Sequence, residues 1–155
     1  MQFFPRPRPR KAFTLIEIMI VVAIIGLIAA MGVPSILQSL QKEGMRKAVD
    51  DMTGVLTDAR SHAILTGQNA EVTFHPLDRT FASSGGKSAM LPDGVDFELL
   101  YINLMDFGKS DVSQARFFPN GTCDELTLVL HSGGDRRKIT LEFSTGLWHV
   151  SDVDK

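Results

Sequence analysis

The chain has 155 residues, of which 44% are hydrophobic and 8% aromatic. This length predicts one globular domain with appended segments, and the composition is that of a folded chain rather than a disordered one. The formal net charge of −2 is unevenly spread, because residues 1–12 hold four basic side chains and no acid, which leaves 12 basic and 18 acidic residues elsewhere. Cys123 is the only cysteine, which excludes an internal disulfide and a paired-cysteine metal site, so we expect a small buried or half-buried side chain rather than a reactive thiol.

Residues 1–12 form a basic leader whose alternating prolines and arginines favour an extended conformation. The apolar run 13–33 follows, and as a helix it would be about 32 Å long, enough to cross a hydrocarbon core of roughly 30 Å. The basic flank predicts that the leader stays in the cytoplasm and that the residues after Val33 lie across the membrane. Two alternatives are a plain single-span anchor and a secretory signal peptide cut near Ala29 and Ala30, although the run exceeds the usual apolar core of about 7–15 residues.

Glu17 is the one charged residue inside this apolar run. An acidic side chain costs roughly 2.5–3.5 kcal/mol at the centre of a membrane-spanning helix, and less towards the ends of the helix. An ionisable residue in such a segment is by default functional, with a partner to be identified. The other interpretation is an acid at the end of the helix, held near the lipid headgroups.

The sequence KAFTLIE, from Lys11 to Glu17, followed by the apolar run and Pro34, resembles the class III signal of type IV prepilins and type II secretion prepseudopilins. In that family a membrane aspartic peptidase cuts just before the phenylalanine on the cytoplasmic side and N-methylates the new terminus. The resemblance implies cleavage between Ala12 and Phe13, with Ala12 where the family usually has glycine, and N-methylation of Phe13. It also implies that the Glu17 carboxylate pairs with the terminal amine of Phe13 on a neighbouring subunit during assembly.

A helical period continues beyond Pro34 to about Thr66. Apolar or small residues recur there at spacings of three and four, while most charged residues fall elsewhere around the axis. The recurring positions are Ile36, Leu37, Leu40, Gly44, Ala48, Met52, Val55, Leu56, Ala59 and Ala63. We therefore expect an amphipathic helix over 34–67 that ends at Gly67 and has a kink at Pro34, which lacks a backbone donor.

From Glu71 the apolar period becomes two, which indicates half-buried strands in a globular domain over 68–155. The residues predicted to face inward are Val72, Phe74, Val95, Phe97, Leu99, Leu126, Leu128, Leu130, Ile139, Leu141 and Phe143. Residues 132–135 and 145–146 are predicted turns, whereas 83–94 and 105–114 are predicted exposed loops. The predicted fold class is α+β: a long N-terminal helix, membrane-spanning in its first half and amphipathic in its second, packed on an antiparallel β-sheet.

Two stretches of this domain narrow the resemblance. Residues 58–74 look like the junction between helix and first strand in minor pilins of the GspH/FimT type, and residues 115–122 look like the start of that family's closing sheet. The resemblance implies a minor pseudopilin of a type II secretion pseudopilus, supporting protein export across the outer membrane. The alternative is a FimT/FimU-like minor type IV pilin in pilus assembly or DNA uptake.

The implied partners are the prepilin peptidase/N-methyltransferase, other pilin or pseudopilin subunits, and the inner-membrane assembly platform. The implied location is the inner membrane, which the chain crosses once with a cytoplasmic N-terminus and a periplasmic globular domain. After processing, the chain would become a filament subunit.

Few other residues suggest a catalytic, metal-binding or nucleic-acid-binding site. Arg136, Arg137 and Lys138 could contact phosphates, but the adjacent Asp135, the acidic processed chain and the lack of interleaved aromatic residues favour a solvated turn over nucleic-acid binding. The four histidines lack ligand spacing, and no nucleophile elbow, phosphate loop or supported carboxylate pair is present. We expect no catalytic residue, metal or cofactor, with a membrane-anchored periplasmic enzyme as the rival from another class.

Two further side chains carry structural predictions. Trp148 is predicted to lie in the core, because it falls in a strand of a small domain. Asp124 is predicted to be solvated or to cap a turn.

Overall fold

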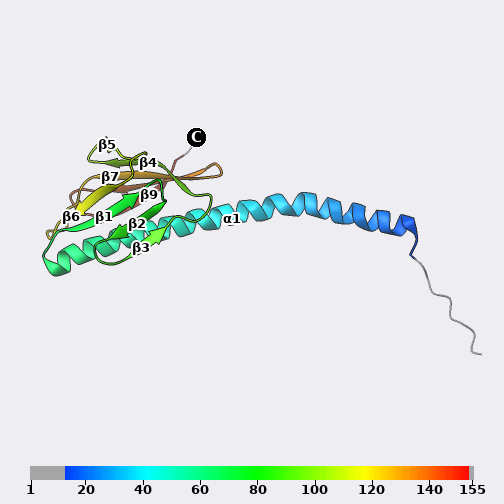
Figure 1. The fold of residues 1–155 in the computed structure, drawn as a ribbon, viewed down its shortest axis with the longest axis horizontal. Coiled ribbons are helices and arrows are strands. Elements are labelled where there is room, and N and C mark those ends of the chain that lie inside the picture. Colours follow the sequence, from blue (N-terminus) through cyan, green and yellow to red (C-terminus); the bar gives the residue numbers. More distant parts are fainter. Residues whose placement is uncertain (1–12, 154–155) are drawn as a thin grey trace, which may run out of the picture. The chain divides into compact units, whose positions relative to one another are not determined.

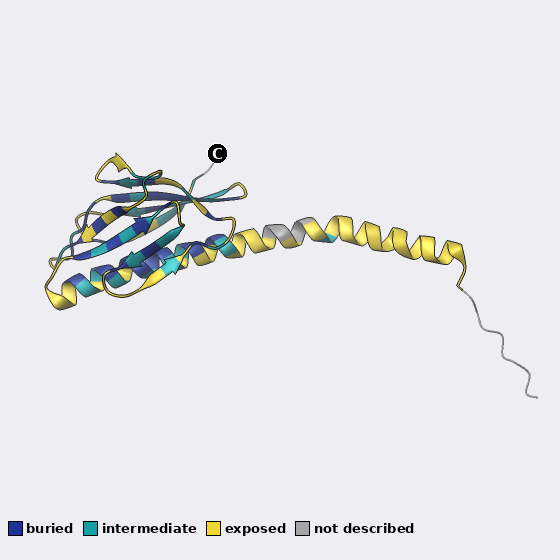
Figure 2. Ribbon diagram, viewed as in Figure 1, coloured by how far each residue is buried: buried dark blue, intermediate teal, exposed yellow. Residues whose placement is uncertain are grey.

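The computed structural model describes residues 13–153, except for the side chains of residues 34, 35, 37 and 38. The chain divides into two units, with the boundary between residues 38 and 39. Helix α1, Leu15–Thr66, has 52 residues and contributes to both units (Figure 1). In the first unit, none of the residues Leu15–Val33 is buried inside the molecule (Figure 2).

The predicted end of α1 at Gly67 is confirmed. Gly67 has a φ of 69°, and its N–H donates to the carbonyl oxygen of Ala63 at 3.1 Å. A glycine in this left-handed conformation stops a helix without the steric cost that a side chain would add.

In the described part of the chain nine strands follow α1, and every strand pairing is antiparallel. They are β1 Ala70–His75, β2 Thr80–Ser83, β3 Ser88–Met90, β4 Asp96–Ile102, β5 Met105–Asp106, β6 Ser113–Phe117, β7 Leu126–Ser132, β8 Asp135–Leu141 and β9 Trp148–Asp152. One sheet has the order β3-β2-β1-β6 and the other β5-β4-β7-β8-β9. The prediction of a long helix packed on antiparallel β-structure is confirmed, and the β-structure is divided into two sheets.

The core of the second unit lies between α1 and the sheets. The buried residues of α1 are Met45, Ala48, Met52, Thr53, Val55, Leu56, Ala59 and Ala63. The strands contribute alternate residues, as a pleated strand with one buried face requires. Their buried apolar residues include the predicted Val72, Phe74, Leu126, Leu128, Leu130, Ile139 and Leu141.

Three residues predicted to face inward are exposed instead. The pairing of β4 with β7 shifts register between Phe97 and Leu99, so Leu100 takes the buried position and Leu99 is 37% exposed. A bulge of this kind moves every later side chain of the strand to the opposite face. Phe143 lies beyond the end of β8 and is 64% exposed, and Trp148 is 44% exposed on the edge strand β9.

The two predicted loops contain short strands. Residues 83–94 include β3, and residues 105–114 include β5 and the start of β6. β3 and β5 are edge strands of three and two residues. Strands this short pair through their backbones, and their side chains need not alternate between apolar and polar. The sequence therefore has no periodic pattern there that would predict a strand.

The predicted turn at residues 132–135 is the β7–β8 hairpin, in which Ser132 pairs with Asp135. Gly133 and Gly134 have φ values of 55° and 104°, which a two-residue hairpin loop requires. The turn at 145–146 is also confirmed, and Gly146 there has a φ of 63°. A Cβ on Gly146 would lie 2.6 Å from the carbonyl oxygen of Gly121, so the position requires glycine.

Candidate assembly site at the start of the helix

Thr14 caps the N-terminus of α1. The N–H of Glu17 donates to Thr14 Oγ1 at 3.3 Å, and the N–H of Ile18 donates to the Thr14 carbonyl oxygen at 3.4 Å. A threonine followed three residues later by glutamate is the capping-box arrangement, in which each side chain satisfies a backbone donor at the helix start. The local sequence therefore fixes the start of α1 and places Glu17 in its first turn.

The position of Glu17 is also favourable electrostatically. The N-terminus of a helix carries a partial positive charge, so a carboxylate in the first turn is stabilised, whereas a cation there is destabilised. Phe13 immediately precedes the cap and is 78% exposed. A free amine on Phe13 would lie at the positive end of α1 and would need a carboxylate partner.

The apolar segment behind this site is not buried by any of the residues that the structure describes. Leu15–Val33 is, within residues 13–153, the helical stretch that is long and apolar enough to cross a membrane. Such a continuous apolar surface needs lipid or other protein around it.

Two predicted site residues lie outside what the structure describes. Ala12, on the leader side of the predicted cleavage point, precedes the described residues. The structure does not describe the side chain of Pro34. Pro34 lies within the bounds of α1, and the kink there remains a prediction.

The basic cluster of β8 does not form one surface. Arg137 lies on the face of β8 that carries the buried Ile139, whereas Arg136 and Lys138 point to the opposite face. Arg136 Nε lies 2.8 Å from Glu98 Oε2.

Arg137 is paired with two carboxylates, Asp135 at 3.5 Å and Asp152. The neighbouring acids therefore offset much of the positive charge of the cluster.

Asp124 is predicted to be solvated or to cap a turn, but it is buried in the structure. Its carboxylate accepts hydrogen bonds from Asn103 Nδ2 at 3.0 Å and from Arg116 N and Nε at 3.0 and 3.1 Å. Burial alone would raise the pKa of Asp124, but these hydrogen bonds and the charge of Arg116 outweigh it and hold the pKa below its ordinary value of 3.8. Asp124 thereby joins β6 of one sheet to the turn after β4 of the other.

The thiol of Cys123 is buried, as predicted. Burial, followed by the negative charge of Asp124, raises its pKa to about 11. A thiol with such a pKa stays protonated at neutral pH and is a poor nucleophile. Among the residues that the structure describes, no group of three or more His, Cys, Asp or Glu side chains could hold a metal ion.

Comparison with known proteins gives three findings. Residues 7–33 match the prokaryotic N-terminal methylation motif. A fimbrial protein of Pseudomonas aeruginosa is 36% identical over 84 residues, and the match spans about half of each chain, 54%. The type II secretion system core protein G of Pectobacterium carotovorum subsp. carotovorum is 30% identical over 116 residues, which cover 66% of this chain and 73% of that protein.

Among solved structures, the crystal structure of the type IV minor pilin FimU of Pseudomonas aeruginosa matches with a TM-score of 0.50. The match covers 71% of this chain and 90% of FimU at 17% sequence identity, so it shows a shared fold.

A methylation motif on an apolar helix, continued into a helix packed on antiparallel sheets, defines a pilin-like subunit. The chain belongs to the type IV pilin-like family, which includes type IV pilins and type II secretion pseudopilins. The resemblance first seen in KAFTLIE is confirmed at this level. The relatives are structural subunits rather than enzymes.

Proposed function

We propose that the chain is a minor subunit of a type II secretion pseudopilus that supports protein export across the outer membrane. The observation that carries this proposal is the similarity to core protein G, which extends over 73% of that protein, whereas the similarity to the fimbrial protein spans 54%. A FimU-like minor pilin is the second candidate, favoured by the fold that the two chains share. In either role the chain is a structural subunit without enzymatic activity.

The first step in this proposal is removal of the leader. The four basic residues of the leader keep it in the cytoplasm, and residues 39–153 are carried to the periplasm. The prepilin peptidase/N-methyltransferase then cuts between Ala12 and Phe13 and methylates Phe13. Thr14 caps α1, which begins at Leu15, so the proposed cut before Phe13 precedes the first helical residue by two positions.

Replacing Ala12 by tryptophan is expected to block this step, because a bulky side chain beside the scissile bond would not fit a site that accepts alanine or glycine. The unprocessed chain should accumulate as a larger band on an immunoblot of native-host membranes. Ala12→Gly is the matched control and should be processed completely. Equal processing of the tryptophan variant and the wild type would place the cut elsewhere.

The second step is assembly, in which Glu17 pairs with the Phe13 amine of the neighbouring subunit. The gross attraction between two charges in a low-dielectric medium is large, but desolvation cancels much of it. The main contribution of the pair is therefore register, since an incoming subunit satisfies the acid only when its terminus has been cut and lies at the correct depth. The apolar helix holds the subunit in the bilayer first and then packs in the filament core, against other subunits delivered by the inner-membrane platform.

Deletion of the gene in the native host distinguishes the two candidate roles. A pseudopilus subunit predicts that protein secretion is lost while surface pili and DNA uptake persist. The reverse pattern, with secretion intact and piliation or DNA uptake lost, would reject the secretion role and favour the FimU-like one. Complementation with the full-length gene is the control.

A further inference from the structure

The edge strand β9 has an open side. Among the described strands it pairs only with β8. The N–H of Glu142 donates to the Leu147 carbonyl, and the N–H of Val153 donates to the Arg136 carbonyl, so residues 147, 149, 151 and 153 direct their backbone groups towards β8. Residues 148, 150 and 152 therefore direct their N–H and C=O groups away from the sheet, which is the arrangement that can accept another strand.

The side chains of the same three residues face α1. Trp148 Nε1 donates to Thr57 Oγ1 at 3.3 Å, Val150 lines a cavity with Val49, and Asp152 pairs with Arg137. One face of β9 therefore lies towards the helix, and the open backbone edge points sideways from that face.

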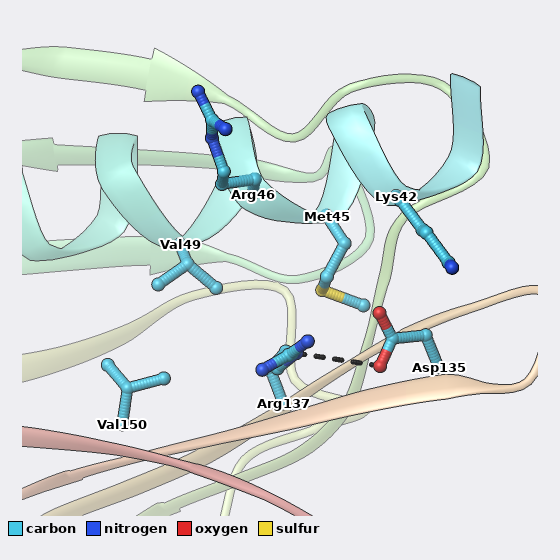
Figure 3. A pocket seen from close by; sticks show the side chains of 7 residues that line it. All are labelled: Lys42, Met45, Arg46, Val49, Asp135, Arg137 and Val150. Carbon is cyan, nitrogen blue, oxygen red and sulfur yellow. Dashed lines mark ion pairs between the residues drawn. The ribbon is translucent and has the colours of Figure 1, made fainter. Parts of the chain in front are cut away.

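Two cavities lie between α1 and this end of the second sheet, and together we call them the α1–β9 cleft. The first, of about 450 Å³, is lined by Lys42, Met45, Arg46, Val49, Asp135, Arg137 and Val150 (Figure 3). The second, of about 370 Å³, is lined by Thr57, Arg60, Gly146, Leu147 and Trp148. Each is large enough for at least one amino-acid side chain.

The two ends of the cleft differ in chemistry. At the first cavity, Val49 and Val150 face each other from α1 and β9, and Lys42 points towards the end where Asp135 lies (Figure 3). Lys42 and Arg46 have no ion-pair partner among the described side chains, whereas Arg137 is neutralised by its two carboxylates. At the second cavity, exposed Trp148 and Leu147 supply an apolar surface. The first cavity thus has two cations without ion pairs, whereas the second combines this apolar surface with one arginine, Arg60, whose Nε donates to the Thr145 carbonyl oxygen at 3.2 Å.

We propose that the α1–β9 cleft binds an extended acidic segment of a partner protein, which adds to the open edge of β9 as a further strand. The backbone groups of residues 148, 150 and 152 would supply the main-chain hydrogen bonds, as in other cases of strand addition. Alternate residues of a strand are about 7 Å apart and share a face. Those facing α1 would be an acid near Lys42 and apolar residues near Val150 and Trp148.

This interaction goes beyond the proposed filament role, because it requires neither cleavage at Phe13 nor pairing of Glu17. A nucleic acid is the less suitable ligand for the cleft. A nucleic acid lacks the alternating N–H and C=O groups that pair with the open backbone edge of β9. In addition, Arg137 already has carboxylate partners.

The test uses the full-length protein in detergent micelles and fluorescence anisotropy of a labelled seven-residue peptide. The peptide has aspartate at position 2, valine at position 4, leucine at position 6 and threonine elsewhere, and the reversed sequence covers the other strand direction. We expect one of the two to bind, and lysine in place of the aspartate to weaken binding about tenfold. No binding by either peptide, or equal binding of the lysine version, would overturn the proposal.

Backbone methylation of the peptide tests strand addition without changing the protein. In a paired strand alternate N–H groups face the partner, so N-methylation of one alternate set should weaken binding about tenfold, while methylation of the other set should not. Equal effects of the two sets would show that no strand forms. A 20-base-pair DNA duplex that displaces the peptide would assign the cleft to nucleic acid instead.

Protein variants locate the site. Val150→Pro removes an N–H that faces the open edge and leaves the bonds to β8 in place, so it should abolish peptide binding while the circular dichroism melting curve stays close to that of the wild type. Ser151→Ala, on the other face of β9, is the matched control and should bind normally. Lys42→Glu should reverse the preference, so that the lysine peptide binds more tightly than the aspartate peptide. Unchanged binding by Val150→Pro would exclude β9 as the binding site. If that variant unfolds, the N-methylated peptides test strand addition on the wild-type protein instead.

Discussion

Replacing Glu17 by glutamine is expected to abolish incorporation of the subunit into filaments while membrane insertion and leader cleavage continue. The bond from the N–H of residue 17 to Thr14 Oγ1 comes from the backbone, and glutamine is as suitable as glutamate at this position of a capping box, so the start of α1 is preserved. The charge that would pair with the Phe13 amine is lost. An amine left unpaired in an apolar environment costs several kcal/mol, which corresponds to a loss of more than about a hundredfold in the equilibrium for adding a subunit.

The measurement is the fraction of subunit in sheared filaments relative to the membrane fraction, determined by immunoblotting. Glu43→Gln removes the same charge from α1 at an exposed position beyond the apolar run, and it should assemble normally. Glu17→Ala removes the charge together with the rest of the polar side chain, so it should assemble no better than Glu17→Gln. Incorporation of Glu17→Gln at the wild-type level would show that the glutamate serves the helix start and not the pairing between subunits.

Replacing Asp124 by alanine is expected to lower the free energy of unfolding by about 1–2 kcal/mol. The substitution removes the largely buried acceptor of the Asn103 amide and of two Arg116 donors, although both of these residues are exposed, so water can satisfy part of what is lost. It also breaks a connection between the two sheets. Urea unfolding of the full-length protein in micelles measures the loss, and Asp111→Ala, at an exposed loop position, is the control expected to change little. A loss below about 0.5 kcal/mol would mean that the network contributes little to stability.

The pH dependence of stability should follow from the same group. Because the folded-state pKa of Asp124 lies below its ordinary value of 3.8, the charged network stabilises the fold fully above that value. The contribution is lost as the pH falls through the lower pKa of the folded state. The wild type should therefore lose more stability than Asp124→Ala over this acid range. Parallel losses in the two proteins would assign the acid sensitivity to other groups.

Features that depend on local sequence could be predicted. Gly67 ends α1 because glycine alone adopts its conformation without strain, and the alternation of Leu126, Leu128 and Leu130 reports a strand with one buried face. The proposed assembly site, which stays a prediction, rests on local sequence in the same way. Phe13, Thr14 and Glu17 form a local motif whose geometry is set within one helical turn.

Features that depend on distant contacts could not be predicted. The bulge in β4 that exposes Leu99 is a property of its pairing with β7, and no residue type within β4 marks it. Asp124 meets Asn103 from 21 residues away, so its local sequence resembles an ordinary solvated turn. A strand position in a small domain predicts a core location for Trp148, but it lies on an edge strand where Thr57 accepts its indole N–H.

The most direct test of the account is the chemical identity of the mature N-terminus, read by mass spectrometry of the protein purified from membranes of its native host. We predict a chain that begins at Phe13 and carries one additional methyl group on its terminal nitrogen. A chain that still begins at Met1 would describe a plain membrane anchor, and one that begins after Ala30 would describe a secreted protein that has lost its signal peptide. Either result would remove the amine that Glu17 is proposed to bind, and with it the filament role.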